Sequence, residues 1–237
     1  MLELLHGPDR TANSMELLAR ICENAAHGVA GQILIVPEQY SHETERALCE
    51  CGGDTISRYA EVLSFTRLAT RVFSVYGGVC EEYLDENGRI LTLYLAAQQV
   101  LPNLKYYASA AVKPAFLQQL AAAIEEFLIY CVTPQSLLDA AARSEGQLAQ
   151  KLQELGLLYE SYLAVCKTGR GDPVTRLYRL NEQLFETDYA SDKTFFLDGF
   201  SDFTAVQLQI LQTLLPQADI TLTLQTGMQE QSVFSAA

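Results

Sequence analysis

Two patterns of apolar and polar positions alternate along the chain. Short apolar runs rich in β-branched or aromatic residues, bounded by turn residues, predict buried strands of a parallel sheet. Such runs occupy residues 2–5, 32–36, 194–197 and 219–225, and one more strand is expected within residues 55–63. We therefore predict an α/β fold whose parallel strands are joined by right-handed crossovers.

Apolar residues at helical spacing follow the strands expected at residues 2–5, at residues 32–36 and within residues 55–63. They predict helices over about residues 14–24, capped by a Ser or Asn residue, and over residues 41–49, with Ser41 as the N-cap. A third helix is expected to begin after Ser64 as N-cap and to end at Gly77 and Gly78, because glycine commonly terminates helices.

The character of the chain changes over residues 79–188. Five segments there have a period near 3.6, and prolines and glycines separate them. These segments are residues 89–100, 115–130, 134–142, 145–167 and 173–185. We predict three parts: residues 1–78 begin the α/β domain, residues 79–188 form an all-helical insertion, and residues 189–237 return to the sheet. Because no run after Leu224 completes the far edge of the sheet, we expect a truncated fragment.

Asp198 stands at the most informative point of the sequence. It follows the apolar run at residues 194–197 and precedes a turn and an apolar-periodic helix. Strand, acid, loop and helix form the Walker-B element, in which the acid holds the Mg²⁺ that bridges nucleotide phosphates. A second acid usually follows and positions the attacking water, but Gly199 takes that place here. The catalytic half of such a site is therefore missing.

The amino-terminal strand–loop–helix is arranged like a P-loop. A P-loop needs glycines that let the backbone approach phosphate, a Lys for the β- and γ-phosphates, and a Ser or Thr for Mg²⁺. Gly7 and Ser14 fit the first and last positions, whereas Ala12 and Asn13 replace the second Gly and the Lys. The competing interpretation is a tight turn followed by a capped helix.

Composition narrows the function classes. The 237-residue chain is 49% hydrophobic and 19% charged, and its net charge of −13 argues against an autonomous DNA-binding module, which is normally basic. No apolar run of 18 residues and no signal peptide is present, so we expect a cytoplasmic protein without a membrane span. The cysteines predict reduced structural thiols and no metal site. They are Cys22, Cys49, Cys51, Cys80, Cys131 and Cys166.

Three stretches support a family resemblance. Residues 63–72 (LSFTRLATRV) resemble the superfamily 1 helicase segment T-F-H-x-L-A-x-R-L, and residues 197–207 (LDGFSDFTAVQ) resemble D-E-x-Q-D-T-x-x-x-Q. Residues 33–48 (ILIVPEQYSHETERAL), together with residues 64–72 and 196–204, look like the amino-terminal region of the AddB family. AddB proteins are the B subunits of AddAB (RexAB) helicase–nucleases. The helical insertion falls where UvrD-like helicases place their 1B subdomain.

The resemblance implies a RecA-like (P-loop NTPase) fold that has lost its motor function. Family members work with an AddA-like helicase–nuclease subunit on broken DNA ends, and the helicase-like part lines the path of single-stranded DNA and scans it for a recombination hotspot. They also carry a carboxyl-terminal nuclease domain with an iron–sulfur cluster, and no residue of this chain matches its acids or cysteines. ATP and Mg²⁺ are therefore not expected cofactors here, since Asn13 replaces the P-loop Lys.

The same resemblance assigns roles to three residues after the third expected strand. Ser64, Phe65 and Arg67 lie where active relatives touch single-stranded DNA, and they would supply a hydrogen bond, base stacking and a phosphate contact. The alternative is that Ser64 is an N-cap and Phe65 a core residue.

Three functional hypotheses follow. The chain is either a scaffold and strand-channel wall without activity of its own, or an active P-loop ATPase in which Arg10 replaces the missing Lys, or a purely structural subunit interface. An ATPase assay distinguishes the inactive scaffold from the active ATPase. An assay of single-stranded DNA binding distinguishes the channel wall from the purely structural interface.

Overall fold

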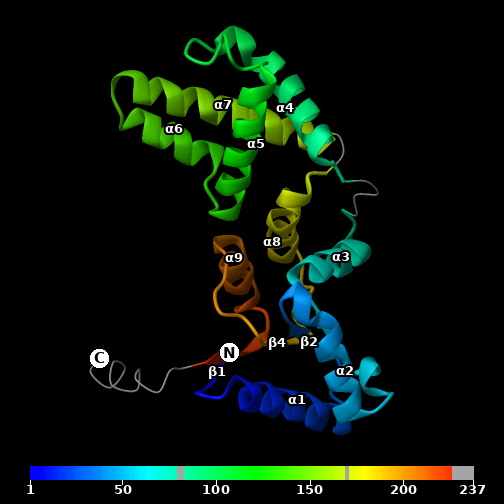
Figure 1. Ribbon diagram of the computed structural model, residues 1–237. Coiled ribbons are helices and arrows are strands. Elements are labelled where there is room, and N and C mark those ends of the chain that lie inside the picture. Colours follow the sequence, from blue (N-terminus) through cyan, green and yellow to red (C-terminus); the bar gives the residue numbers. More distant parts are fainter. Residues whose placement is uncertain (79–82, 169–170, 226–237) are drawn as a thin grey trace, which may run out of the picture. The chain divides into compact units, whose positions relative to one another are not determined.

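The computed structural model describes residues 1–78, 83–168 and 171–225 (Figure 1). Cys80, Gly169, Arg170 and the polar stretch at residues 226–237 lie outside the described residues. Contacts divide the chain into two compact units. The first comprises Met1–Gly77, Leu180–Phe203 and Gln207–Ala237, and the second comprises Gly78–Arg179 and Thr204–Val206.

The first unit contains a five-stranded parallel sheet, which confirms the α/β prediction. Its strands are β1 (Leu2–Gly7), β2 (Gln32–Ile35), β3 (Ala60–Leu63), β4 (Thr194–Leu197) and β5 (Asp219–Gln225), in the order β1-β5-β4-β2-β3. β5 thus lies between β1 and β4, with Leu2 opposite Ile220 and Ile220 opposite Phe195. The carboxyl ends of all five strands consequently meet at one edge, where ligands bind in open α/β sheets.

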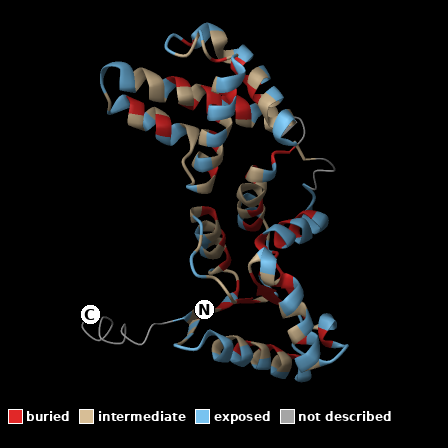
Figure 2. Cartoon of the chain, in the orientation of Figure 1, coloured by how far each residue is buried: buried red, intermediate tan, exposed pale blue. Residues whose placement is uncertain are grey.

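The strands form because their side chains are buried on both faces. Every residue of β2 is buried, as are Phe195, Phe196 and Leu197 of β4 (Figure 2). One core cluster joins β2, β3 and β4 to helices α1 (Arg10–Ala26) and α2 (Ser41–Gly52). Its buried members are Leu17, Ile21, Ala25, Leu34, Val36, Leu48, Ile56, Ala60, Val62 and Phe196.

Two helix boundaries correct the sequence prediction and one confirms it. Helix α1 begins at Arg10, not near residue 14, because Asp9 is its N-cap. The N-cap position of α2 is held by Tyr40, and Ser41 is its first helical residue. Ser64 caps α3 (Phe65–Tyr76) as expected, and Gly77 follows its last residue with φ of +88°, a conformation that favours glycine.

The second unit is helical. It contains α4 (Glu86–Val100), α5 (Pro114–Ile129), α6 (Pro134–Ala142) and α7 (Gly146–Thr168), all within a few residues of the predicted segments. The segment expected as one helix over residues 173–185 is instead a short 3-10 turn, η4 (Pro173–Thr175), followed by α8 (Arg176–Glu186). The unit has its own core, whose largest fully buried side chains include Tyr159, Tyr162, Leu93, Ile124 and Leu158.

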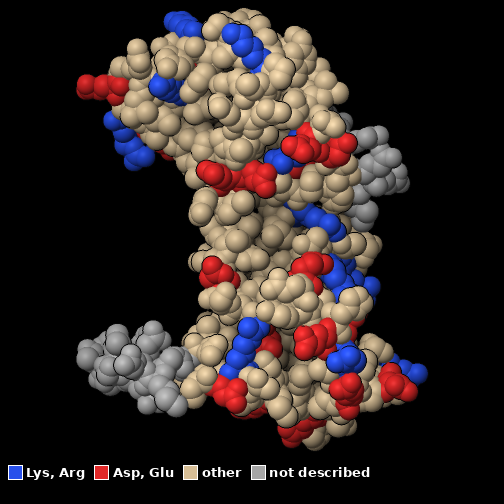
Figure 3. All heavy atoms as spheres, in the orientation of Figure 1, with Lys and Arg blue, Asp and Glu red and all other residues tan. Residues whose placement is uncertain are grey.

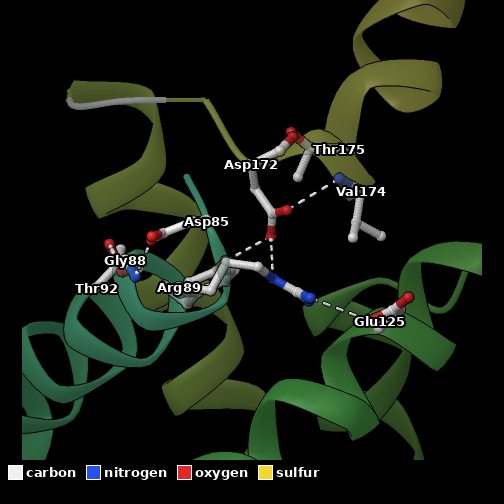
Figure 4. Close-up of polar contacts among 9 residues, drawn as sticks. Asp85, Gly88, Arg89, Thr92, Glu125, Asp172, Val174 and Thr175 are labelled. Carbon is white, nitrogen blue, oxygen red and sulfur yellow. Dashed lines mark hydrogen bonds and ion pairs between the residues drawn. The ribbon is translucent and has the colours of Figure 1, made fainter. Parts of the chain in front are cut away.

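A buried polar cluster fastens η4 to the helices of this unit (Figure 4). The fully buried Asp172 carboxylate accepts hydrogen bonds from the Tyr162 hydroxyl at 2.5 Å and the Val174 N–H at 2.9 Å. Arg89 Nε lies 3.4 Å from Asp172 Oδ2, and Arg89 Nη1 lies 3.1 Å from Glu125 Oε2. Burial, and then the Asp172 charge, raises the pKa of Tyr162 far above its ordinary value. The tyrosine therefore stays protonated and donates to Asp172.

Helix α9 (Ala205–Leu214) follows β4 in sequence and precedes β5.

Among the described residues, no single helix has both the length and the apolar character of a membrane span. Helices α5 and α6, which are bent sharply relative to each other, have that length and apolar character only when counted together.

Candidate nucleotide site at the carboxyl edge of the sheet

The β1–α1 turn is shorter than a phosphate-binding loop. β1 ends at Gly7 and α1 begins at Arg10, so only Pro8 and Asp9 lie between them. The Asp9 Oδ1 atom accepts hydrogen bonds from the backbone N–H groups of Thr11 at 2.9 Å and Ala12 at 3.4 Å. Free N–H groups at a helix N-terminus are the groups that bind phosphate. Here an internal carboxylate occupies them.

Asn13 occupies the space beside Gly7. Its Nδ2 atom donates to the Leu224 carbonyl at 3.1 Å and to the Gly7 carbonyl at 3.4 Å, which links α1 to β5 and β1. A Cβ atom on Gly7 would lie 2.7 Å from Asn13 Oδ1. The glycine therefore permits close packing of Asn13. Ser14, half-buried, lies inside α1 rather than at its start.

Asp198 follows β4 directly, as expected for a Walker-B acid. Its Oδ1 atom accepts a hydrogen bond from the Thr223 hydroxyl at 2.5 Å, and its backbone N–H donates to the Ile35 carbonyl at 3.0 Å. The acid is thus fixed between β5 and β2. The sequence alone indicated the position of Asp198 but not its partner Thr223, which lies on a strand distant in sequence.

Arg10 reaches the same edge from the first turn of α1. Its Nη2 atom donates to the Gly199 carbonyl at 3.2 Å, and its guanidinium lies 5.0 Å from the centre of the Tyr40 ring. Gly199 has φ of +83°, and a Cβ atom there would lie 3.0 Å from Arg10 Nη2. A hydrogen bond with Gln39, followed by the contact with Arg10, lowers the pKa of Tyr40. The arginine is therefore already engaged by the chain.

A cavity of about 210 Å³ remains between these groups. Its lining residues are Arg10, Asn13, Gly199, Phe200, Ser201, Thr223, Leu224 and Gln225. The volume lies below the range of about 300–1,000 Å³ typical of small-molecule sites, and among the described lining residues Arg10 is the one cation. No group of three or more His, Cys, Asp or Glu side chains suited to a metal ion occurs within the described part of the chain.

The three residues expected to contact DNA lie at the start of α3, and they differ in exposure. Ser64 is 3% exposed and its hydroxyl caps the helix by accepting from the Arg67 N–H at 3.2 Å. Phe65 is 4% exposed. The Arg67 side chain is 46% exposed, and its Nη1 atom lies 2.6 Å from Glu45 Oε1. Of the three, Arg67 alone presents its side chain to solvent.

An aromatic row extends from Phe65. Its ring meets the Phe200 ring edge-on with centres 5.7 Å apart, and Phe200 stacks on Phe203 at 4.8 Å. Phe200 and Phe203 are half-buried. Sequence reasoning did not single them out, although the F-x-x-F spacing after Asp198 was the signal available.

Comparisons with known proteins agree with the fold. Residues 5–236 match the family described as "ADDB, N-terminal". Three similar proteins are each named as the B subunit of an ATP-dependent helicase/deoxyribonuclease. The protein of Thermoanaerobacter sp. (strain X514) is 33% identical over 90% of this chain, that of Clostridium tetani 34% over 82%, and that of Clostridium botulinum (strain Hall) 30% over 85%. The chain spans 17–18% of the length of these relatives.

Proposed function

Since the chain belongs to the AddB amino-terminal family, we propose that it is the helicase-like part of a DNA helicase–deoxyribonuclease subunit that has given up nucleotide binding. In this proposal the parent protein processes broken DNA ends for recombinational repair. The chain forms one wall of the channel for a separated DNA strand and a docking scaffold for the motor subunit, and it hydrolyses no ATP itself.

The filled phosphate cradle carries the proposal. Asp9 occupies the N–H groups at the start of α1, and Asn13 bonds the carbonyls of Gly7 and Leu224 where the P-loop Lys would point at phosphate. A triphosphate would meet the negatively charged Asp9 carboxylate where it needs backbone N–H donors. Repulsion between the two negative charges opposes nucleotide binding.

The hydrolytic half of the site supports the same conclusion. Gly199 stands where an acid would position the attacking water, and Asp198 is already bonded to Thr223. Arg10, the candidate replacement for the P-loop Lys, is held by the Gly199 carbonyl and Tyr40. The rival interpretation as an active ATPase would require Asp198, Arg10 and the backbone at Gly199 to rearrange.

Contact with single-stranded DNA is proposed at the start of α3. Arg67 reaches a phosphate by exchanging its partner Glu45, and the half-buried Phe200 and Phe203 rings offer stacking surfaces next to Phe65. Because the net charge is −13, we expect binding at physiological salt to need positive charge from a partner, and we assign this role to an AddA-like motor subunit. The iron–sulfur cluster of the family is assigned to the part of the parent protein beyond this chain.

Isothermal titration calorimetry with Mg²⁺ and ATP tests the carrying observation. We expect no binding heat at millimolar nucleotide for the wild-type chain and none for Asn13→Lys, because Asp9 still fills the helix N-terminus in that variant. Micromolar binding that disappears on Asp198→Ala would refute the proposal. An ATPase assay with single-stranded DNA, on wild type and Arg10→Ala, checks the rival enzyme.

Fluorescence anisotropy with a labelled single strand tests the channel role. Arg67→Ala is compared with Arg71→Ala, a matched control on the same helix whose side chain is 53% exposed and paired with Glu61 at 2.9 Å. We expect Arg67→Ala to weaken binding more than Arg71→Ala. Equal effects would remove Arg67 from the channel wall, and no binding by any form at low salt would favour a purely structural interface.

A further inference from the structure

Acidic residues are unevenly distributed along the chain. Asp and Glu make up 29 of the 237 residues, yet residues 87–124 contain none. This acid-free stretch carries Arg89, Lys105 and Lys113. Arg89 is committed to its carboxylate partners Asp172 and Glu125 inside the helical unit. Lys105 and Lys113 are exposed, and within the described residues neither forms an ion pair.

Both lysines lie on the connection between α4 and α5, which a buried acid holds in place. Glu154 of α7 is 3% exposed, and it accepts the backbone N–H groups of Lys105, Tyr106 and Tyr107, each at 2.8 Å. Burial alone would raise the pKa of Glu154, but these three donors, together with the Gln150 amide at 3.2 Å, outweigh it and lower the pKa. The acid is thus ionised and turned toward the backbone, so it fixes the connection without pairing with the lysine side chains.

A third cation joins the connection from α7. Lys151 Nζ lies 4.8 Å from the centre of the Tyr106 ring, and the Tyr107 ring meets Tyr106 edge-on at 5.0 Å. The ring face of Tyr106 therefore orients a cation. Lys105, Lys113 and Lys151 with Tyr106 are called the basic connection below. Figure 3 shows Lys and Arg side chains over the segment that joins α4 to α5, with no Asp or Glu side chain on that segment in this view.

We propose that the basic connection binds the phosphate backbone of duplex DNA. The inference deepens the proposed DNA-processing function and assigns a second nucleic-acid contact, separate from the start of α3. Charge complementarity carries it, because exposed lysine side chains that no carboxylate neutralises attract a polyanion. Lys151 lies over the Tyr106 ring, which is 40% exposed. The proposed contact is made by the lysine ammonium groups to phosphates, so it is independent of sequence. Duplex DNA is favoured because it carries one charge per about 1.7 Å of helix axis.

The test is fluorescence anisotropy of the 237-residue chain with a labelled duplex of about 20 base pairs and the matching single strand, from about 20 to 200 mM salt. The variant is Lys105→Gln/Lys113→Gln. Its control is Arg46→Gln/Arg58→Gln, which removes two exposed cations of the first unit and so changes the net charge equally. Lys151→Gln is measured separately, and circular dichroism confirms that each variant is folded.

We expect the lysine pair to weaken duplex binding about tenfold or more at the lowest salt and to reduce the slope of log K against log salt by about 2, near 1 per lost phosphate contact. The arginine pair should change the affinity less than about twofold. Equal losses in the two pairs, an undetectable duplex complex for the wild type at about 20 mM salt, or a loss as large for the single strand would each overturn the inference. None of these results bears on the calorimetry of ATP binding. Failure of the duplex-binding inference and failure of the proposed function are therefore distinguishable.

Discussion

Glu154 is the residue whose replacement tests the architecture of the basic connection most directly. Its two carboxylate oxygens divide the three backbone donors: Oε1 accepts from Lys105 and Tyr106, and Oε2 accepts from Tyr107. Glu154→Gln keeps the shape of the side chain and one acceptor oxygen. The new amide nitrogen, however, faces a backbone N–H whichever way the amide is turned, so at least one donor is left unsatisfied.

The structure gives the size of the effect. Hydrogen bonds to a charged group contribute about 1.5–3 kcal/mol each, neutral ones about 0.5–1.5, and a buried unsatisfied donor costs about 1–3. Weakening two bonds and losing the third therefore predicts a cost of about 3 kcal/mol in the free energy of unfolding of the helical unit. For a chain of this size such a cost lowers Tm by about 6–12 °C.

The pH dependence follows from the lowered pKa of Glu154. A carboxylate with a depressed folded-state pKa stabilises the protein above its unfolded pKa, and that stabilisation is lost as the pH falls through the lower, folded value. The stability difference between wild type and Glu154→Gln is therefore full at neutral pH, and it shrinks once the pH falls below the ordinary pKa of about 4.3.

Thermal and urea unfolding followed by far-UV circular dichroism measure both quantities, at about pH 7 and about pH 3.5. Glu160→Gln is the control, because Glu160 is an exposed acid on the same helix. A Glu154→Gln cost as small as that of Glu160→Gln, or a difference that does not shrink in acid, would refute the reasoning. The variant should also bind duplex DNA more weakly, since Lys105 loses its support.

Three further outcomes are expected. Asp172→Ala should destabilise the helical unit by about 3–5 kcal/mol in urea unfolding, because the Tyr162 hydroxyl loses its acceptor and the Arg89 guanidinium keeps Glu125 alone as carboxylate partner; a cost below about 1 kcal/mol would contradict the buried-pair account. Gly7→Ala should cost about 1–3 kcal/mol, because its Cβ would lie 2.7 Å from Asn13 Oδ1; a neutral result would mean that Asn13 moves freely. Burial raises the pKa of Cys22 to about 12, so mass spectrometry should find iodoacetamide modifying Cys22 far more slowly than the exposed Cys49, and equal rates would show that Cys22 is accessible as thiolate.

Secondary structure followed largely from local pattern. The strand at residues 194–197 and the helix at residues 134–142 have the predicted bounds, because an apolar run identifies the strand and the helical period after Pro134 identifies the helix. The start of α1 was misplaced, because Arg10–Asn13 carry no apolar period. Asp9, the true cap, stands before four residues whose pattern is equally compatible with a loop.

The amino-acid sequence by itself determined that Gly7 and Asn13 lie in a strand–loop–helix segment, that Asp198 follows a strand, and that the Lys and second acid of a nucleotide site are absent. Only the tertiary structure decided what takes the place of phosphate. Asn13 bonds the carbonyl of Leu224 and Asp198 bonds the hydroxyl of Thr223 because β5 lies between β1 and β4. Strand order is a property of the whole packed sheet, so no local pattern carries it.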